Sequence, residues 1–202
     1  GRLLAPLVHG YLDYREWRAA TPDDVAVERL DGVPAATVAA LYSRAVPDRI
    51  HVVRDEPYID WRFSNPNWDC RTYLARRDGR LVGGLVTCSD TVDGATTTRL
   101  ADALPLVGGS DDVFAALVSA VVADTPRAAV LTATADPIPV EVLTDFGFLA
   151  DDTAPLSRLV TRSTHVTKPL PSSESGEGWR LGGVEIDDAE NWSLSPSDQD
   201  IA

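Results

Sequence analysis

The spacing of apolar residues in the first third of the chain predicts one strand followed by two helices. Residues 26–30 have the composition of a short strand. Residues 34–45 carry apolar side chains at helical spacing, behind a proline that suits the first helical turn. A second helix is predicted to begin at Asp55, which can cap it. It should end before the Asn65-Pro66 pair, because a residue that precedes proline leaves the helical region.

The middle of the chain predicts an antiparallel hairpin and a further strand. Residues 71–76 and 80–87 have the extended pattern, and the Asp78-Gly79 pair between them is a strong signal for a two-residue turn. Residues 96–104 predict the next strand. These segments would therefore be neighbours in one sheet.

The last third of the globular part predicts two helices that alternate with strands. Residues 113–122 carry an apolar stripe at helical spacing, and Ser110 is the expected cap of that helix. Residues 128–134 are an apolar, β-branched run, typical of a buried strand. A short helix over 137–146 and a last strand over 156–161 complete the pattern. The alternation predicts a mixed α/β fold with helices on both faces of the sheet.

The two ends of the chain differ in composition from its middle. Residues 1–20 are an apolar segment with partly helical spacing, and no Met occurs even at position 1, so we expect the end of a preceding region here. This segment needs a surface, which the domain, the tail or a second copy of the chain could supply. Residues 169–202 are predicted to be an acidic linker with a partly docked tail, because six apolar residues accompany 8 acids and 1 base from residue 170 onward. Residues 21–168 would form the main domain.

The charge balance of the chain argues against one class of binding partner. Acidic residues outnumber basic ones 31 to 18, for a net charge of −13, and Lys occurs once against 17 Arg. Such a chain repels phosphate backbones, so nucleic acid is not expected as a partner. The excess of Asp and Arg resembles proteins of salt-loving archaea, and an ordinary acidic protein is the alternative. No apolar run reaches the roughly 20 residues of a membrane helix, so we expect no membrane contact and a cytoplasmic location.

Two cysteines bear on metal binding and on the compartment. Cys70 and Cys88 lie 18 positions apart, with no Cys-x-x-Cys spacing and no neighbouring His. This pattern does not support a zinc site, and we expect no metal. Two buried free thiols in a reducing cytoplasm are the prediction.

The order of the predicted elements resembles that of the GNAT acyltransferase family over about residues 24–165. The most specific part is DPIPVEVLTDFGF at 136–148, where the family commonly has a helix closed by Gly-Phe. The YIDWRFSNP segment at 58–66, before the hairpin, is similar to acetyltransferase-like proteins of haloarchaea. The resemblance implies a mostly antiparallel sheet, acetyl-CoA as the acyl donor, and a small-molecule or peptide amine as the acceptor.

The acyl-CoA motif of that family, Gln/Arg-x-x-Gly-x-Gly/Ala, matches PLVGGS at 105–110 in degenerate form. Its glycines let the backbone approach a pyrophosphate, which free N–H groups and the start of a helix then bind. Pro105 replaces the Gln or Arg, and Asp111 and Asp112 follow where an anion would arrive. The resemblance assigns cofactor binding to this set: Leu106, Val107, Gly108, Gly109, Ser110 and Asp111.

The catalytic residues are less defined. The Tyr that usually serves as general acid in the family corresponds to Leu143, which cannot transfer a proton. The candidates that remain are Tyr58, Arg62 and His51. Two functions therefore stay open: an acyl-CoA-dependent N-acyltransferase that acts mainly by positioning, and a catalytically inactive GNAT-like binding or structural module of a longer protein.

Overall fold

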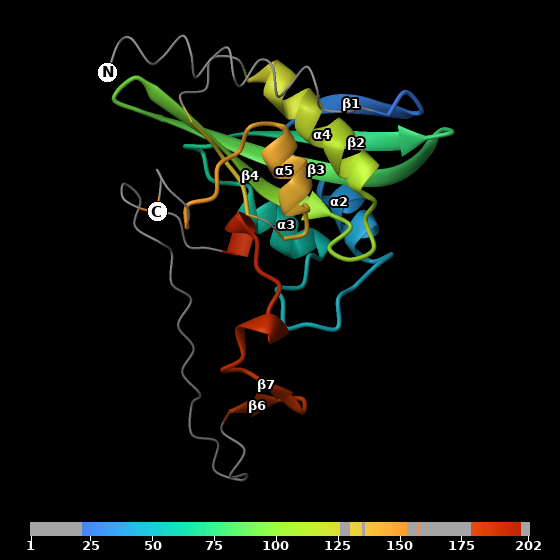
Figure 1. The fold of residues 1–202 in the computed structure, drawn as a ribbon, viewed down its shortest axis with the longest axis vertical. Coiled ribbons are helices and arrows are strands. Elements are labelled where there is room, and N and C mark those ends of the chain that lie inside the picture. Colours follow the sequence, from blue (N-terminus) through green and yellow to red (C-terminus); the bar gives the residue numbers. More distant parts are fainter. Residues whose placement is uncertain (1–21, 126–129, 135, 153–156, 158–178, 199–202) are drawn as a thin grey trace. The chain divides into compact units, whose positions relative to one another are not determined.

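A five-stranded sheet with helices on each face carries the larger part of the described structure (Figure 1). The computed structural model describes residues 22–125, 130–134, 136–152, 157 and 179–198. Their contacts separate two compact units. Among the described residues, the first unit holds 22–46, 52–148 and 194–198, and the second holds 47–51 and the described part of 149–193.

The strands follow one another across the sheet in chain order, β1-β2-β3-β4-β5. They are β1 (Val25–Asp31), β2 (Asp69–Arg77), β3 (Arg80–Val92), β4 (Ala95–Leu104) and β5 (Val130–Thr132). The pairs from β1 to β4 are antiparallel, and β5 pairs with β4 in parallel. The prediction of a mixed α/β fold with a mostly antiparallel sheet is confirmed.

Two tight turns build the antiparallel core of the sheet. Asp78 and Gly79 join β2 to β3 with φ angles of 51° and 75°, and Asp93 and Gly94 join β3 to β4 with φ angles of 51° and 81°. Two successive residues with positive φ match the right-handed twist of a hairpin, and Asp-Gly adopts that conformation at low cost. The predicted turn at Asp78-Gly79 is confirmed.

One face of the sheet packs against α4 (Asp111–Asp124) and α5 (Val140–Asp145). The predicted apolar stripe of α4 points into this core. Its buried members are Val113, Phe114, Leu117, Val118 and Val121. Ser110 is the N-cap residue of α4, as predicted. Gly147, with φ 83°, lies directly after the last turn of α5 and ends that helix.

The opposite face packs against α2 (Ala35–Tyr42) and α3 (Glu56–Arg62). Asp55 caps α3, as predicted, because its side chain accepts a hydrogen bond from the Tyr58 N–H at 2.9 Å. Two adjacent glycines of β3 let helices approach both faces. A Cβ on Gly83 would meet Val113 at 2.7 Å, and a Cβ on Gly84 would meet Leu41 at 2.9 Å.

The second half of β4 has one open side among the described residues. β5 pairs with β4 only at positions 97–99, so β4 continues from Leu100 to Leu104 beyond the last pair. A bulge interrupts the same stretch on its β3 side, because Val86 faces Asp102 while Thr87 faces Leu100. The candidate site therefore begins where the sheet loses its regular pairing.

Two sequence predictions about buried groups are wrong. Cys70 and Cys88 form a disulfide instead of two free thiols. They are directly opposed across β2 and β3, in a register that the turn at Asp78-Gly79 and the irregularity between Ala75 and Arg76 set together. The argument from free thiols to a reducing compartment therefore no longer holds. The described part of the predicted buried strand over 128–134 is β5, which has no second neighbour among the described strands and in which Val130 and Thr132 are exposed.

The second unit contains a small hairpin of β6 (Arg180–Leu181) and β7 (Val184–Glu185). A short 3-10 helix, η2 (Ala189–Asn191), leads to a backbone bridge between Ile50 and Trp192. The predicted helix over 1–20, the strand over 156–161 and the domain boundaries at 20/21 and 168/169 lie outside the described residues.

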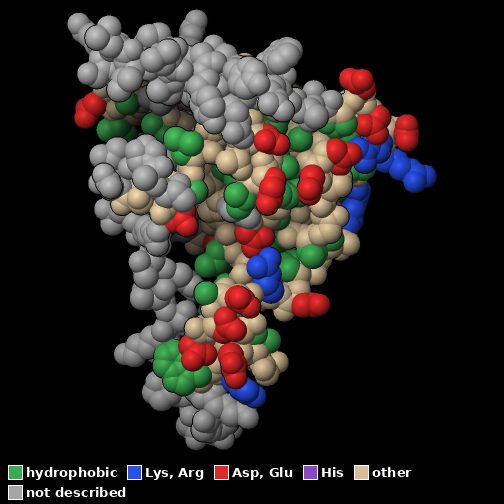
Figure 2. Space-filling view, in the orientation of Figure 1, with side chains coloured by type: hydrophobic (Ala, Val, Ile, Leu, Met, Phe, Trp, Pro, Cys, Tyr) green, Lys and Arg blue, Asp and Glu red, His purple; other side chains and the backbone are tan. Residues whose placement is uncertain are grey.

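No helix within the described ranges is long and apolar enough to span a membrane. Acidic side chains are spread over the face that carries α4 and α5 (Figure 2). Since the net charge is −13, these side chains repel one another at low ionic strength.

The melting temperature should therefore rise with KCl. Screening lengths fall from about 10 Å at 0.1 M to about 3 Å at 1 M salt, so the steepest rise is expected below about 0.5 M. A gain of several degrees is expected, since about 1 kcal/mol moves the melting temperature of a chain this size by roughly 2–4 °C. Thermal scans from low salt to about 2 M KCl test this, and a flat or falling profile would contradict it.

Candidate functional site

The loop between β4 and α4 presents a row of free backbone donors. Leu106 is buried and anchors the loop, whereas Val107 is exposed. Gly108 has φ 70°, and a Cβ on Gly109 would meet the Phe114 ring at 2.5 Å, so both positions require glycine. The N–H groups of residues 107–112 make no hydrogen bond within the described part of the chain. Together with the start of a 14-residue helix they form a geometry that suits an anion.

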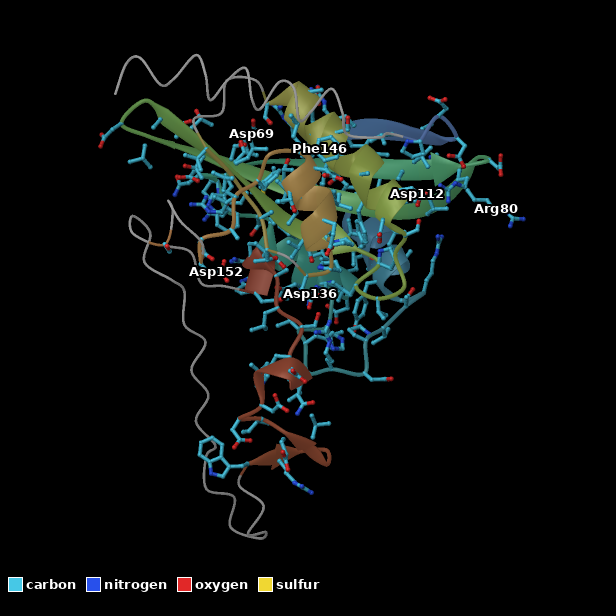
Figure 3. The ribbon with its side chains drawn as sticks, viewed as in Figure 1. Asp69, Arg80, Asp112, Asp136, Phe146 and Asp152 are labelled. Carbon is cyan, nitrogen blue, oxygen red and sulfur yellow. A yellow bond between two sulfur atoms is a disulfide. The ribbon has the colours of Figure 1, made fainter. Side chains whose placement is uncertain are left out.

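A groove lies beside this loop, between α4 and α5. It has a volume of about 220 Å³ and an apolar floor of Ala115, Val142 and Phe146. Asp112 on α4 and Phe146 at the end of α5 are labelled in Figure 3. Its rim carries four carboxylates: Asp111, Asp112, Glu141 and Asp145.

Arg77 neutralises one of these carboxylates. It extends from the end of β2 and pairs with Asp112 and, at 2.7 Å, with Asp24. The Ser110 hydroxyl and Arg77 hold the pKa of Asp112 below its usual value, so this carboxylate stays charged and bound. Asp111 remains exposed at the first turn of the helix.

The backbone of this site suits an acyl-CoA, whereas the side chains around it do not. The free N–H groups and the loop glycines suit a pyrophosphate, while the carboxylate rim repels one. No lysine or arginine belongs to residues 105–112. Binding at this loop would therefore rest on backbone donors and the helix dipole, and would depend strongly on salt.

A second polar centre lies on the opposite face of the sheet, and sequence reasoning missed it. Arg54 is fully buried just before α3, and its Nε donates to Asp102 of β4 at 3.1 Å. Its Nη2 donates to Asp198 at 2.7 Å and to the Ser195 hydroxyl at 3.1 Å. These partners lie 48 to 144 positions from Arg54, so no local motif marks the cluster.

The three charges of this centre do not balance. One guanidinium faces two buried carboxylates, and Asp102 Oδ1 has no hydrogen-bond partner within the described residues. Burial would lower the pKa of Arg54, but Asp102 and Asp198 more than offset this and keep it charged. Burial raises the pKa of Asp102; Arg54 opposes this effect and Asp198 adds to it.

Tyr58 and Arg62, two of the catalytic candidates, lie next to this centre on α3. The Tyr58 hydroxyl donates to the Ser197 carbonyl at 3.0 Å, and burial raises the pKa of this phenol. The Arg62 guanidinium lies over the Trp68 ring, 5.0 Å from its centroid. Both side chains thus pack around the C-terminal segment of residues 194–198.

A cavity of only about 10 Å³ remains between this segment and the sheet. Its lining is Arg62, Trp68, Cys88, Arg99, Ala101, Pro196 and Ser197. Arg99 is the last β4 residue paired with β5, and Ala101 is the bulged residue, so the cavity adjoins the open stretch of β4. It holds no more than a water molecule.

The other predicted residues lie elsewhere. His51 belongs to the second unit, where its Nδ1 donates to the Arg49 carbonyl at 2.6 Å. Leu143 belongs to α5, and its side chain is buried in the core on that face of the sheet. The described residues contain no group of three or more His, Cys, Asp or Glu side chains placed to hold a metal ion.

Comparison with known proteins yields similar folds at low identity. No protein-family profile matches the sequence, and no curated protein matches it significantly. A ribosomal-protein-alanine N-acetyltransferase from Brucella melitensis biovar Abortus 2308 has a TM-score of 0.45 and 18% identity, covering 71% of this chain and 98% of its own. An aminoglycoside acetyltransferase from an uncultured soil metagenomic sample, in complex with trehalose, has a TM-score of 0.43 and 13% identity, covering 74% and 98%. These values assign neither an activity nor a ligand to this chain.

The buried Asp102 should make stability depend on pH. Its folded-state pKa is raised, so the folded chain holds a proton that the unfolded chain releases. Stability of the wild type should fall, relative to Asp102→Asn, as pH rises from about 4 toward the raised pKa, by up to about 1.4 kcal/mol per pH unit. Urea unfolding between about pH 4 and pH 8 measures this.

The exposed Asp187 supplies the matched control, because Asp187→Asn removes one carboxylate without touching the buried centre. The same unfolding series on this variant shows how much of any change follows from the loss of one surface carboxylate. A wild type that gains stability over Asp102→Asn with rising pH would show that Arg54 dominates the carboxylate.

Proposed function

We propose that this protein is an N-acyltransferase of the GNAT type, with an acyl-CoA as donor and an amine as acceptor. The observation that carries the proposal is the row of free N–H groups over residues 107–112, at the end of the open stretch of β4. If the pyrophosphate of the acyl-CoA binds at the loop, the open stretch of β4 remains free to align the extended pantetheine arm that carries the acyl group. The bound donor would supply a thioester: the amine nitrogen would form a bond to the acyl carbon, the carbon–sulfur bond would break, and CoA would leave as the thiol with the proton that the amine loses.

The residues of this chain would act mainly by positioning. The N–H groups of 107–112 would hold the pyrophosphate, and Gly108 and Gly109 would keep that backbone accessible. The open edge of β4 from Leu100 to Leu104, about 13 Å long at an ordinary strand rise, would align the arm toward the bulge. Holding two reactants in line in this way supplies much of a reaction's acceleration without a dedicated acid or base.

The residue at position 143 of α5 cannot donate or accept the proton that the reaction moves. Leu143 carries no ionisable group, and a raised pKa keeps the Tyr58 phenol protonated and bonded to Ser197. An amine that reaches the site already deprotonated would need no base. Amines of small molecules or peptides with a depressed pKa are therefore the proposed acceptors.

A non-catalytic binding module is the second candidate, and one observation favours it. Pro196 and Ser197 cover the cavity beside the β4 bulge, and the volume that remains, about 10 Å³, is too small for an acceptor amine. In that case the fold would serve as a scaffold, and acyl-CoA would bind weakly or not at all.

Titration calorimetry with acetyl-CoA in about 2 M KCl separates the two candidates. The proposed enzyme should bind, and should transfer a radiolabelled acetyl group to at least one member of a panel of amines and peptides. Desulfo-CoA is the control for binding without transfer. Binding without any transfer would support the module, and an absence of binding at all salt concentrations would contradict the proposed function.

Removal of the two carboxylates at the helix start should tighten CoA binding. A charge about 4 Å from a phosphate contributes roughly 1 kcal/mol in a water-like dielectric, so Asp111→Asn/Asp112→Asn should lower the Kd about 10-fold or more at low salt. The change also frees Arg77 from Asp112. The gain should shrink in molar KCl, because salt screens the repulsion.

Two variants serve as controls for that titration. Asp60→Asn removes an exposed carboxylate on α3, on the other face of the sheet, and should leave the affinity unchanged. Gly108→Leu should weaken binding, since a side chain at φ 70° strains the loop. An Asp111→Asn/Asp112→Asn protein with wild-type affinity would place the phosphates elsewhere.

A further inference from the structure

The 194–198 segment lies on the α2/α3 face like a peptide in a binding site. Arg54 contacts Asp198 and Ser195, and Tyr58 contacts the Ser197 carbonyl. Pro196 and Ser197 cover the cavity beside the β4 bulge. We propose that this segment is a displaceable internal ligand, and that the Arg54 pocket it fills is a binding site for acidic peptides.

The charge count of the pocket supports a separable occupant. Arg54 and Asp102 both belong to the body of the domain, and together they form a neutral, fully buried pair. Asp198 brings a second carboxylate to the same guanidinium at 2.7 Å, and the side chain of Asp198 is only 2% exposed. Arg54 and Asp102 thus balance each other without the segment, whereas docking brings a second carboxylate to the same guanidinium and adds to the rise in the pKa of Asp102. A permanent core element would not be expected to carry that cost.

The contacts that hold the segment are those of peptide recognition. A guanidinium meets a carboxylate, a phenol donates to a backbone carbonyl, and a proline lines the small cavity beside the β4 bulge. The segment also organises its own carboxylate, because the Ser195 N–H donates to Asp198 at 2.8 Å and the Asp198 N–H donates to the Ser195 carbonyl at 3.0 Å. A Ser-Pro-Ser-Asp sequence thus presents one carboxylate in a compact turn.

The walls of the pocket define the ligand class. The small cavity that Pro196 and Ser197 cover is also lined by Arg62, by the aromatic ring of Trp68 and by Arg99, which pairs with Asp90. This set suits a short peptide with one carboxylate and a small or proline residue two positions before it. If the proposed function holds, the same pocket would receive the acceptor next to the open stretch of β4; the binding itself does not rest on that function.

The first test asks whether the segment can leave while the domain stays folded. Asp198→Ala removes the carboxylate, and Asp187→Ala removes an exposed one as the matched control. Hydrogen exchange on the full chain should show faster exchange at the 194–198 amides in Asp198→Ala, with the sheet amides protected as in the wild type. Loss of protection throughout the sheet, or global unfolding, would show the segment to be part of the core and would overturn the proposal.

The second test measures binding in trans. The probe is a fluorescein-labelled synthetic peptide of residues 193–199, followed by anisotropy. It should bind the Asp198→Ala chain at least 10-fold more tightly than the wild type or Asp187→Ala, in which the segment competes in cis. The same peptide with Ala in place of Asp198 should lose at least 10-fold, since a charged hydrogen-bonded pair is removed.

A third variant checks that the peptide uses the same pocket. Tyr58→Phe, added to Asp198→Ala, deletes one hydrogen bond to the peptide backbone and should weaken binding about 3- to 10-fold. A folded Asp198→Ala chain that binds no peptide, or binds equally well with and without the Tyr58 hydroxyl, overturns the proposal. None of these measurements involves acyl-CoA, so their failure and that of the proposed function are distinguishable.

Discussion

The incomplete pairing of β4 is the constraint on which both sites depend. Its first residues are held between β3 and β5, but beyond Arg99 the β5 side is open within the described structure. The bulge at Ala101 then changes which residues face the α2/α3 layer, and this places Asp102 opposite Arg54. The same strand ends at the loop whose N–H groups are free. One irregular strand therefore separates the loop that we propose to bind an anion, at its end, from the pocket that holds the Asp198 carboxylate, at its middle.

Features fixed by a few neighbouring residues were predictable from the sequence. The Asp78-Gly79 turn, the cap at Asp55 and the stripe of α4 each depend on chemistry within one turn of chain, and all three are confirmed. The loop over 105–110 was found because glycine spacing before a helix is a local signal. Even so, its side-chain pattern did not show that Arg77, 35 positions away, would neutralise Asp112.

Features set by register and by long-range contacts were not predictable. The disulfide depends on Cys70 and Cys88 facing each other across a hairpin, which a spacing of 18 positions does not by itself reveal. Arg54 stands in an unremarkable loop, and its partners come from β4 and from the far end of the chain. Hydrophobic periodicity carries no signal for a buried charge, because such a residue is an exception to the pattern rather than part of it.

The two sites use acidic residues in opposite ways. On the α4/α5 face the carboxylates remain in solvent, where salt weakens their repulsion of an incoming anion. On the α2/α3 face Asp102 and Asp198 are removed from water, so salt cannot screen them and only Arg54 offsets their charge. Ionic strength should therefore control the loop, while protonation or exchange of one carboxylate should control the pocket. Since both sites share β4, release of the 194–198 segment would uncover the bulge without altering the loop, and the two halves of the proposed acyl-transfer site could then be filled independently.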